Sequence, residues 1–249
     1  MDLSAFTFEA LLPFIAIGFA AQLLDGALGM AFGVISNTLL ISMGVPPAAA
    51  SAGVHAAESF TTGASGISHI AHRNVDWKLF RRLVIPGVAG GVLGAYILSS
   101  VNAEAARPFV LAYLCAIGLY LLWRGIRVHP TQKAPKVVGP LGFRDAAGGA
   151  GWGAVVTSNL LVQGGSPRKV VGTVNTVEFF LAVSISATFI FTLGLAAFTI
   201  ATAGLVIGGV VAAPLGALVT KRVPAKPLLI LVGIVLTITS LYGVARAML

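Results

Sequence analysis

The sequence predicts an all-α polytopic membrane protein made of two homologous halves. Only 10% of its 249 residues are charged and 57% are hydrophobic, with a mean hydropathy of +0.95. A soluble domain carries about a quarter charged residues, so this chain is too poor in charge to cover a water-facing surface. Two further observations support the prediction: a series of apolar segments of membrane-spanning length and an internal repeat.

The net charge of +8 is expected to come from Lys and Arg in cytoplasmic loops, following the positive-inside rule. No basic run with interleaved aromatic residues accompanies it, so no nucleic acid partner is expected. The single cysteine, Cys115, excludes an intrachain disulfide framework and a CxxC metal site. No metal or other cofactor is expected, because the histidines form no motif of the HExxH kind.

Charges, Pro and Gly divide the chain into apolar segments, most with the roughly 20 residues that a bilayer core requires. The first is expected to be a retained helix, since no Lys or Arg precedes Arg73 and a cleavable signal peptide needs a positive start. Segments 27–44 and 146–163 are shorter and rich in glycine. In order, the segments are 8–24, 27–44, 48–71, 83–101, 107–126, 146–163, 168–193, 196–219 and 227–247.

An internal repeat organises these segments. The stretch that begins at Asp25 aligns without gaps with the stretch that begins at Asp145, at a constant offset of 120 residues. The predicted organisation is a first half with a leading helix (1–126), a polar linker (127–143) and a second half (144–249). The matched pairs are Asp25/Asp145, Gly29/Gly149, Gly33/Gly153, Leu40/Leu160, Gly44/Gly164, Pro47/Pro167, Val54/Val174, Glu58/Glu178 and Phe60/Phe180.

The basic residues indicate that the two halves are inverted relative to each other. Loops that are basic in one half are uncharged or nearly so in the other, as expected for inverted repeats. We favour seven crossings plus two short re-entrant helical hairpins, at 27–44 and 146–163, with a cytoplasmic N-terminus. All Lys and Arg except Arg107 and Arg246 then lie on one side. The alternative, eight plain transmembrane helices with 8–44 as one long helix, separates the charges less completely.

Glycines four residues apart predict close packing between the helices. Gly87 and Gly91 lie in one segment, and Gly204 and Gly208 lie in another. Small faces of this kind let helix backbones approach closely within a bilayer.

Three stretches resemble the TauE/SafE sulfite exporter family, also called the toluene sulfonate uptake permease family. They are "GFAAQLLDGALGMAFG", "GVPPAAASAGVHAAESFTTGASGISH" and "RNVDW", and the resemblance covers nearly the whole chain, including its duplication. It implies a multi-pass secondary transporter in the cytoplasmic (inner) membrane. The implied substrate is a small sulfur-containing anion such as sulfite, sulfoacetate or another organosulfonate.

Glu58 and Glu178 are the ionisable residues nearest the middle of their segments. A charge at this depth is costly and usually faces a cavity or a partner. His55 lies one turn from Glu58, and Asn175 takes the matching place beside Glu178. A His–Glu pair can hold or pass on a proton near neutral pH, so Glu58 and Glu178 are candidates for proton coupling. The alternative is a protonated Glu that bonds a neighbouring helix.

Asp25 and Asp145 open the two short segments. They are candidate ion or proton sites, or else N-caps that accept backbone N–H groups.

Polar side chains near the predicted hairpin turns are candidates for binding the anion. Broken helix ends can aim N–H dipoles at an anion, and hydroxyl and amide groups add neutral donors. No Lys or Arg lies deep in a segment, so His55 is the only candidate cation. The complete set of candidate binding residues is His55, Ser36, Asn37, Thr62, Ser158, Asn159 and Asn175.

No enzymatic activity is expected, because the chain has no GxSxG motif and no Cys/His cluster. The expected function is a secondary transporter, for which proton coupling is left open. The alternatives are an uncoupled anion channel or permease and an integral membrane enzyme. The expected partners are a small anionic substrate and the lipid bilayer. The sequence leaves homo-oligomerisation open.

Overall fold

The computed structural model describes residues 7–29, 31–127, 152–162, 165–222 and 225–248. Within these ranges the chain is entirely helical, without a strand, as the fold class requires. The helices are α1 (Phe8–Leu28), α2 (Phe32–Ser42), α3 (Pro47–Ala71), α4 (Trp77–Ser100), α5 (Ala103–Arg127), α7 (Trp152–Val162), α8 (Pro167–Leu193), the 3₁₀ turn η2 (Leu195–Ala197), α9 (Ile200–Arg222) and α10 (Ala225–Met248). Arg127 ends α5, and the rest of the predicted linker lies outside the described residues, as does Asp145.

The turn between α1 and α2 corrects one prediction. Residues 27 and 28 belong to α1, the backbone reverses at Gly29 with φ 66°, and α2 is one continuous helix. The predicted hairpin 27–44 with its turn near Ser36 therefore does not form. Glycine adopts a positive φ without steric cost, so the chain can turn at position 29. In the second half, α7 is also continuous through Ser158, and the start of segment 146–163 is outside the described residues.

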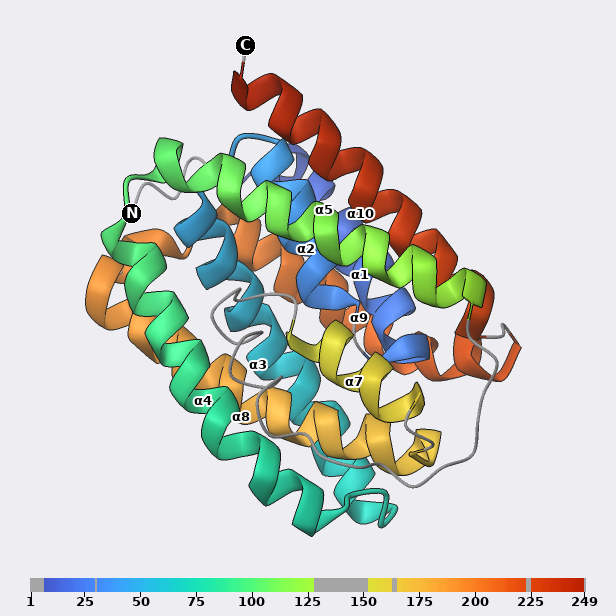
Figure 1. Ribbon diagram of the computed structural model, residues 1–249. Helices are drawn as coiled ribbons and strands as arrows, with labels where there is room; N and C mark the ends of the chain where they lie inside the picture. Colours follow the sequence, from blue (N-terminus) through green and yellow to red (C-terminus); the bar gives the residue numbers. More distant parts are fainter. Residues whose placement is uncertain (1–6, 30, 128–151, 163–164, 223–224, 249) are drawn as a thin grey trace.

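Helices α1, α3 and α9 run in the same direction. Gly204 of α9 lies against Leu11 and Phe14 of α1, and Gly208 lies against Ile15 and Phe19. Gly53 of α3 lies against Thr202, and Thr61 against Gly209. In each pair of helices, contacts at higher residue numbers on one helix are made with higher residue numbers on the other. Helix α9 therefore packs parallel to α1 and to α3 (Figure 1).

The remaining close pairs also meet at glycines. Gly87 and Gly91 of α4 face Leu181 and Ile185 of α8, so these two helices are parallel. The glycine spacing thus packs helices closely, as predicted. Antiparallel pairs form between α3 and α8, where Gly63 faces Phe179 and Gly66 faces Thr176, and between α5 and α10, where Gly118 faces Thr237 and Gly125 faces Ile230.

The bundle presents apolar side chains outward as well as inward. Among the described residues, four helices are long and apolar enough to cross a membrane: α1, α4, α5 and α8. Phe191 is 88% exposed and Phe109 is 77% exposed. Large apolar side chains exposed in this way suit a lipid environment better than water.

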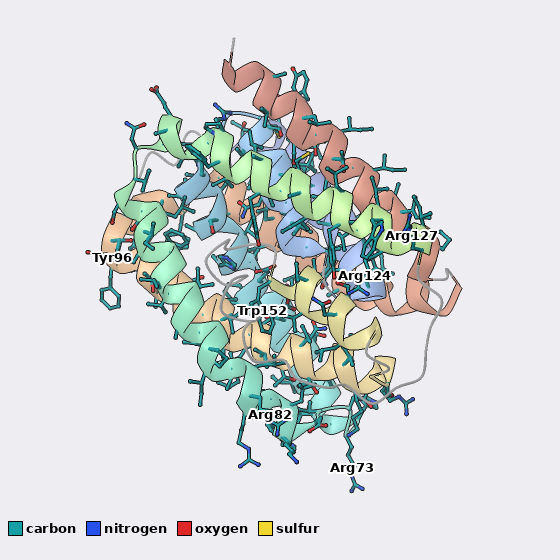
Figure 2. All side chains as sticks on the ribbon, viewed as in Figure 1. Arg73, Arg82, Tyr96, Arg124, Arg127 and Trp152 are labelled. Carbon is teal, nitrogen blue, oxygen red and sulfur yellow. The ribbon has the colours of Figure 1, made fainter. Side chains whose placement is uncertain are left out.

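Basic residues from distant parts of the chain meet at one end of the bundle. The ammonium of Lys169, in the first turn of α8, donates to the backbone oxygens of Arg73 and Val75 in the α3–α4 connection, at 2.8 and 3.3 Å. Figure 2 shows Arg73 and Arg82 at this end, well away from Tyr96 near the other end of α4.

Candidate functional site

A histidine–glutamate pair lies inside the bundle on α3. His55 Nδ1 and Glu58 Oε2 are 2.9 Å apart, because residues i and i+3 share one helix face. His55 is only 4% exposed. Its other ring nitrogen, Nε2, is buried and has no hydrogen-bond partner within the described part of the chain. The pair therefore has a buried ring nitrogen that can accept or donate one further hydrogen bond.

Glu178 of α8 faces the same interior region. Its carboxylate interacts electrostatically with Asp25 of α1 and Glu58 of α3. It also packs against Gly153 at the start of α7, where any side chain would overlap Oε1. Glu178 thus lies within electrostatic range of an acid on each of two other helices. The two glutamates that align at the 120-residue offset are both part of this arrangement.

Asp25 caps the start of α2 from the end of α1. Its Oδ1 accepts the backbone N–H groups of Ala31 at 2.7 Å and Phe32 at 3.1 Å. These are among the N–H groups that have no acceptor within α2 itself. Asp25 therefore acts as a helix cap, one of the two roles considered for it. It does so from within α1, before the turn, and not from the first position of α2.

The α1–α2 turn contacts the second half of the chain. Thr157 of α7 donates to the Gly29 oxygen at 3.5 Å. Asn175 of α8 lies beside the same glycine, whose added Cβ would be 3.3 Å from Nδ2. That amide donates to the Val171 oxygen at 3.0 Å. Asn175, the counterpart of His55 in the repeat, therefore faces the turn.

The other candidate side chains are divided between two kinds of environment. The hydroxyls of Thr62 and Ser158 bond carbonyls of their own helices, at Glu58 and Ala154, as Ser and Thr commonly do in membrane helices. Ser36 and Asn37 lie in the middle of α2, not at a hairpin turn, and are buried. Ser36 Oγ and Asn37 Oδ1 find no partner among the described residues.

Asn37 lines a cavity of about 460 Å³. Ser51 and Tyr113 contribute further polar groups, and the rest of the lining is mostly apolar. The cavity lies between the second half of α4 and the first half of α5, so it belongs to the end of the bundle opposite Arg73. His55 is not part of its lining, so the structure does not bring Asn37 and His55 into one pocket.

Arg124 was missed by the sequence analysis, which found no deep cation other than His55. The residue is only 8% exposed. Its Nη2 donates to Asn159 Oδ1 at 2.6 Å and to the Tyr120 hydroxyl at 2.7 Å, and its Nε donates to the same hydroxyl at 2.9 Å. Arg124 is in the last turn of α5, so its position along the segment suggested exposure. One feature of the sequence could have identified it: Tyr120 lies one turn earlier on the same helix face, where its hydroxyl can accept from the guanidinium.

The described residues hold no cluster of three His, Cys, Asp or Glu side chains that could bind a metal ion. The interior of the described bundle instead contains three acids (Asp25, Glu58 and Glu178), one histidine and one arginine. Ionisable groups inside a lipid-facing helical bundle typically mark a path for ions or polar solutes. Fold and site together are those of a polytopic membrane transporter.

The comparisons with known proteins are consistent with this class. Residues 14–243 match the family described as "Sulfite exporter TauE/SafE", and the chain belongs to the TauE/SafE sulfite exporter family. A curated relative, the "Probable membrane transporter protein YtnM" of Bacillus subtilis (strain 168), is 44% identical over 239 residues, which are 90% of this chain and 79% of the relative. No solved structure matches significantly. The resemblance noted in the sequence is confirmed, and the family indicates transport and not enzymatic catalysis.

Proposed function

We propose that this protein is a secondary transporter that moves a small sulfur-containing anion, such as sulfite, sulfoacetate or another organosulfonate, across the cytoplasmic membrane together with a proton. The family name supports the substrate class. The His55–Glu58 pair supports the coupling. We expect the anion and the lipid bilayer to be its partners.

The observation that carries the proposal is the buried, unpartnered Nε2 of His55. A carboxylate can only accept, so the short contact with Glu58 places a hydrogen on Nδ1. Nε2 is then the nitrogen that gains or loses the proton. When protonated, it is a charged donor for an anion; when neutral, it is an acceptor and holds the anion poorly. One proton and one anion would therefore bind together.

An inverted repeat would provide the two halves that move against each other. Under the 120-residue offset, α3 corresponds to α8 and α4 corresponds to α9. Gly87 of α4 packs on Leu181 of α8, and Gly209 of α9 packs on Thr61 of α3, the residue that corresponds to Leu181. Equivalent contacts in both halves, formed by parallel helices in each case, support a pseudo-two-fold relation of the kind found in secondary transporters.

The direction of α1 changes the membrane orientation that we propose. The basic ends of α4 and α8 are expected to face the cytoplasm. Helix α3 ends beside them, and α1 runs parallel to α3 through α9. The start of α1 would then be outside. This replaces the cytoplasmic N-terminus expected from the sequence, which required α1 and α3 to be antiparallel.

The test is uptake into proteoliposomes containing the purified protein, with radiolabelled sulfite outside and an inward proton gradient. Glu58→Gln is expected to abolish proton-driven accumulation but to leave exchange of sulfite between equal internal and external pools. Glu104→Gln, an exposed acid in the first turn of α5, is the matched control and should behave as wild type.

Three other outcomes would each contradict one part of the proposal. Full proton-driven accumulation in Glu58→Gln would exclude this pair as the coupling site. A wild-type sulfite flux that is the same with and without the proton gradient would favour the uncoupled channel or permease. Preference for simple carboxylates over every sulfur anion would overturn the substrate class.

A further inference from the structure

Arg124 is a buried cation without an acidic partner in the described structure. The histidine–carboxylate contact found among the described residues, His55–Glu58, is on a different helix, α3. Arg124 instead bonds two neutral oxygens, from Tyr120 and Asn159, and its guanidinium carbon lies 5.2 Å from the centre of the Tyr120 ring. Removing a guanidinium from water is costly unless another charge compensates for it.

Part of this cost has a local compensation. Arg124 is in the last turn of α5, where the helix dipole favours a positive charge. The dipole amounts to about half a charge at the helix end, so the guanidinium keeps an excess of positive charge. A purely structural arginine would be expected to pair with a carboxylate, yet the α7 residue that it contacts is an asparagine.

Two donor groups in this cluster remain unused within the described residues. Arg124 donates through Nε and Nη2 only, and Asn159 uses only its oxygen. The Nη1 group and the Asn159 amide nitrogen are therefore available to a ligand. A guanidinium edge with a neighbouring amide is well suited to an oxyanion, because two oxygens of the same anion can accept from the two donors.

We propose that Arg124 and Asn159 form an oxyanion-binding site at the C-terminal end of α5, with Tyr120 holding both side chains in place. Helix α7 connects this site to the interior acids: Asn159 contacts α5, and Thr157, two residues earlier, contacts the α1–α2 turn. The site is separate from His55. Its identification as a sulfite or sulfonate site rests on the proposed function; its affinity for an oxyanion does not.

The test is isothermal titration calorimetry on the purified full-length protein in detergent, with sulfite, sulfoacetate, sulfate, phosphate, acetate and chloride as the titrated anions. Asn159→Asp is the decisive variant, because it places a carboxylate on the guanidinium and fills the anion's place. Arg124→Gln removes the charge. Arg127→Gln, exposed on the next turn, is the matched control. Melting temperatures without added anion show whether each variant is folded.

We expect wild type and Arg127→Gln to bind sulfite alike, and Arg124→Gln and Asn159→Asp to bind it at least about tenfold more weakly. Asn159→Asp should melt at or above the wild-type temperature, since it gains an ion pair; a solely structural role for Asn159 would not couple that gain to lost anion affinity. Unchanged sulfite affinity in Asn159→Asp, or no binding of any anion by wild type, would overturn the inference. Arg124-dependent binding of phosphate or sulfate without sulfite would support the site and overturn the proposed substrate.

Discussion

At the residue scale, the two kinds of interior acid differ in what their oxygens contact. Asp25 Oδ1 accepts two backbone N–H groups at the start of α2. Glu58 instead contacts a titratable ring. A carboxylate that bonds backbone donors is needed for its acceptor oxygens, whereas one paired with a histidine is needed for its charge. The two residues should therefore respond differently to replacement by the corresponding amide.

Asp25→Ala should lower the melting temperature of the purified protein, because it leaves two buried N–H groups without an acceptor, at a cost of about 1–3 kcal/mol. Asp25→Asn keeps an acceptor oxygen and should melt near the wild-type temperature and keep most of its transport activity. A stable Asp25→Asn variant without proton-driven uptake would show instead that Asp25 belongs to the proton pathway.

His55→Asn tests the asymmetry between the halves, since it introduces the residue that the second half already has at Asn175. We expect proton-driven sulfite uptake to fall by about tenfold or more, a loss of about 1.4 kcal/mol or more, and to lose its dependence on pH near neutrality. Uptake is measured across external pH 5.5–8. His72→Asn, exposed at the end of α3, is the control; an unchanged pH profile in His55→Asn would rule out His55 as the titrating group.

At the element scale, glycines determine how closely the helices approach. On α9, an added Cβ at Gly208 would overlap the backbone oxygen of Ile15 in α1. On α3, a Cβ at Gly66 would meet Thr176 at 3.5 Å, an ordinary contact. The sequence identified the α9 glycines as a packing face from their spacing. It could not identify α1 as the partner, because helix partners are set by the whole arrangement of the bundle.

Gly208→Ala should lower the melting temperature, because the α1 backbone must move away at a cost of about 1–3 kcal/mol. Gly66→Ala is the matched substitution in a helix interior. It should be neutral or stabilising, since Ala is favoured over Gly in a helix by about 1 kcal/mol. Equal melting temperatures for the two variants would contradict the close contact between α1 and α9.

At the scale of the whole molecule, the parallel course of α1, α3 and α9 determines which ends of the chain share a side of the membrane. Thr7 at the start of α1 and Asn102 between α4 and α5 should be on the side opposite Lys78. The charge pattern alone favoured a different arrangement, since seven crossings with separate hairpins also place most basic residues together.

Cysteine labelling can test this arrangement, because Cys115 is the only native cysteine and is buried. In a Cys115→Ser background, an impermeant maleimide should label Thr7→Cys and Asn102→Cys in intact cells, and Lys78→Cys only after permeabilisation. Labelling of Thr7→Cys only after permeabilisation, together with Lys78→Cys, would restore the cytoplasmic N-terminus and an antiparallel α1.

The membrane class, the family and the helical pairing of His55 with Glu58 follow from the sequence alone, because composition, motif and i,i+3 spacing are local properties. Only the tertiary structure revealed the turn at Gly29, the group formed by Asp25, Glu58 and Glu178, and the contact of Arg124 with Asn159. That last contact joins residues 35 positions apart. Whether a terminal arginine is exposed or buried depends on which helix packs beside it, and here that helix is α7.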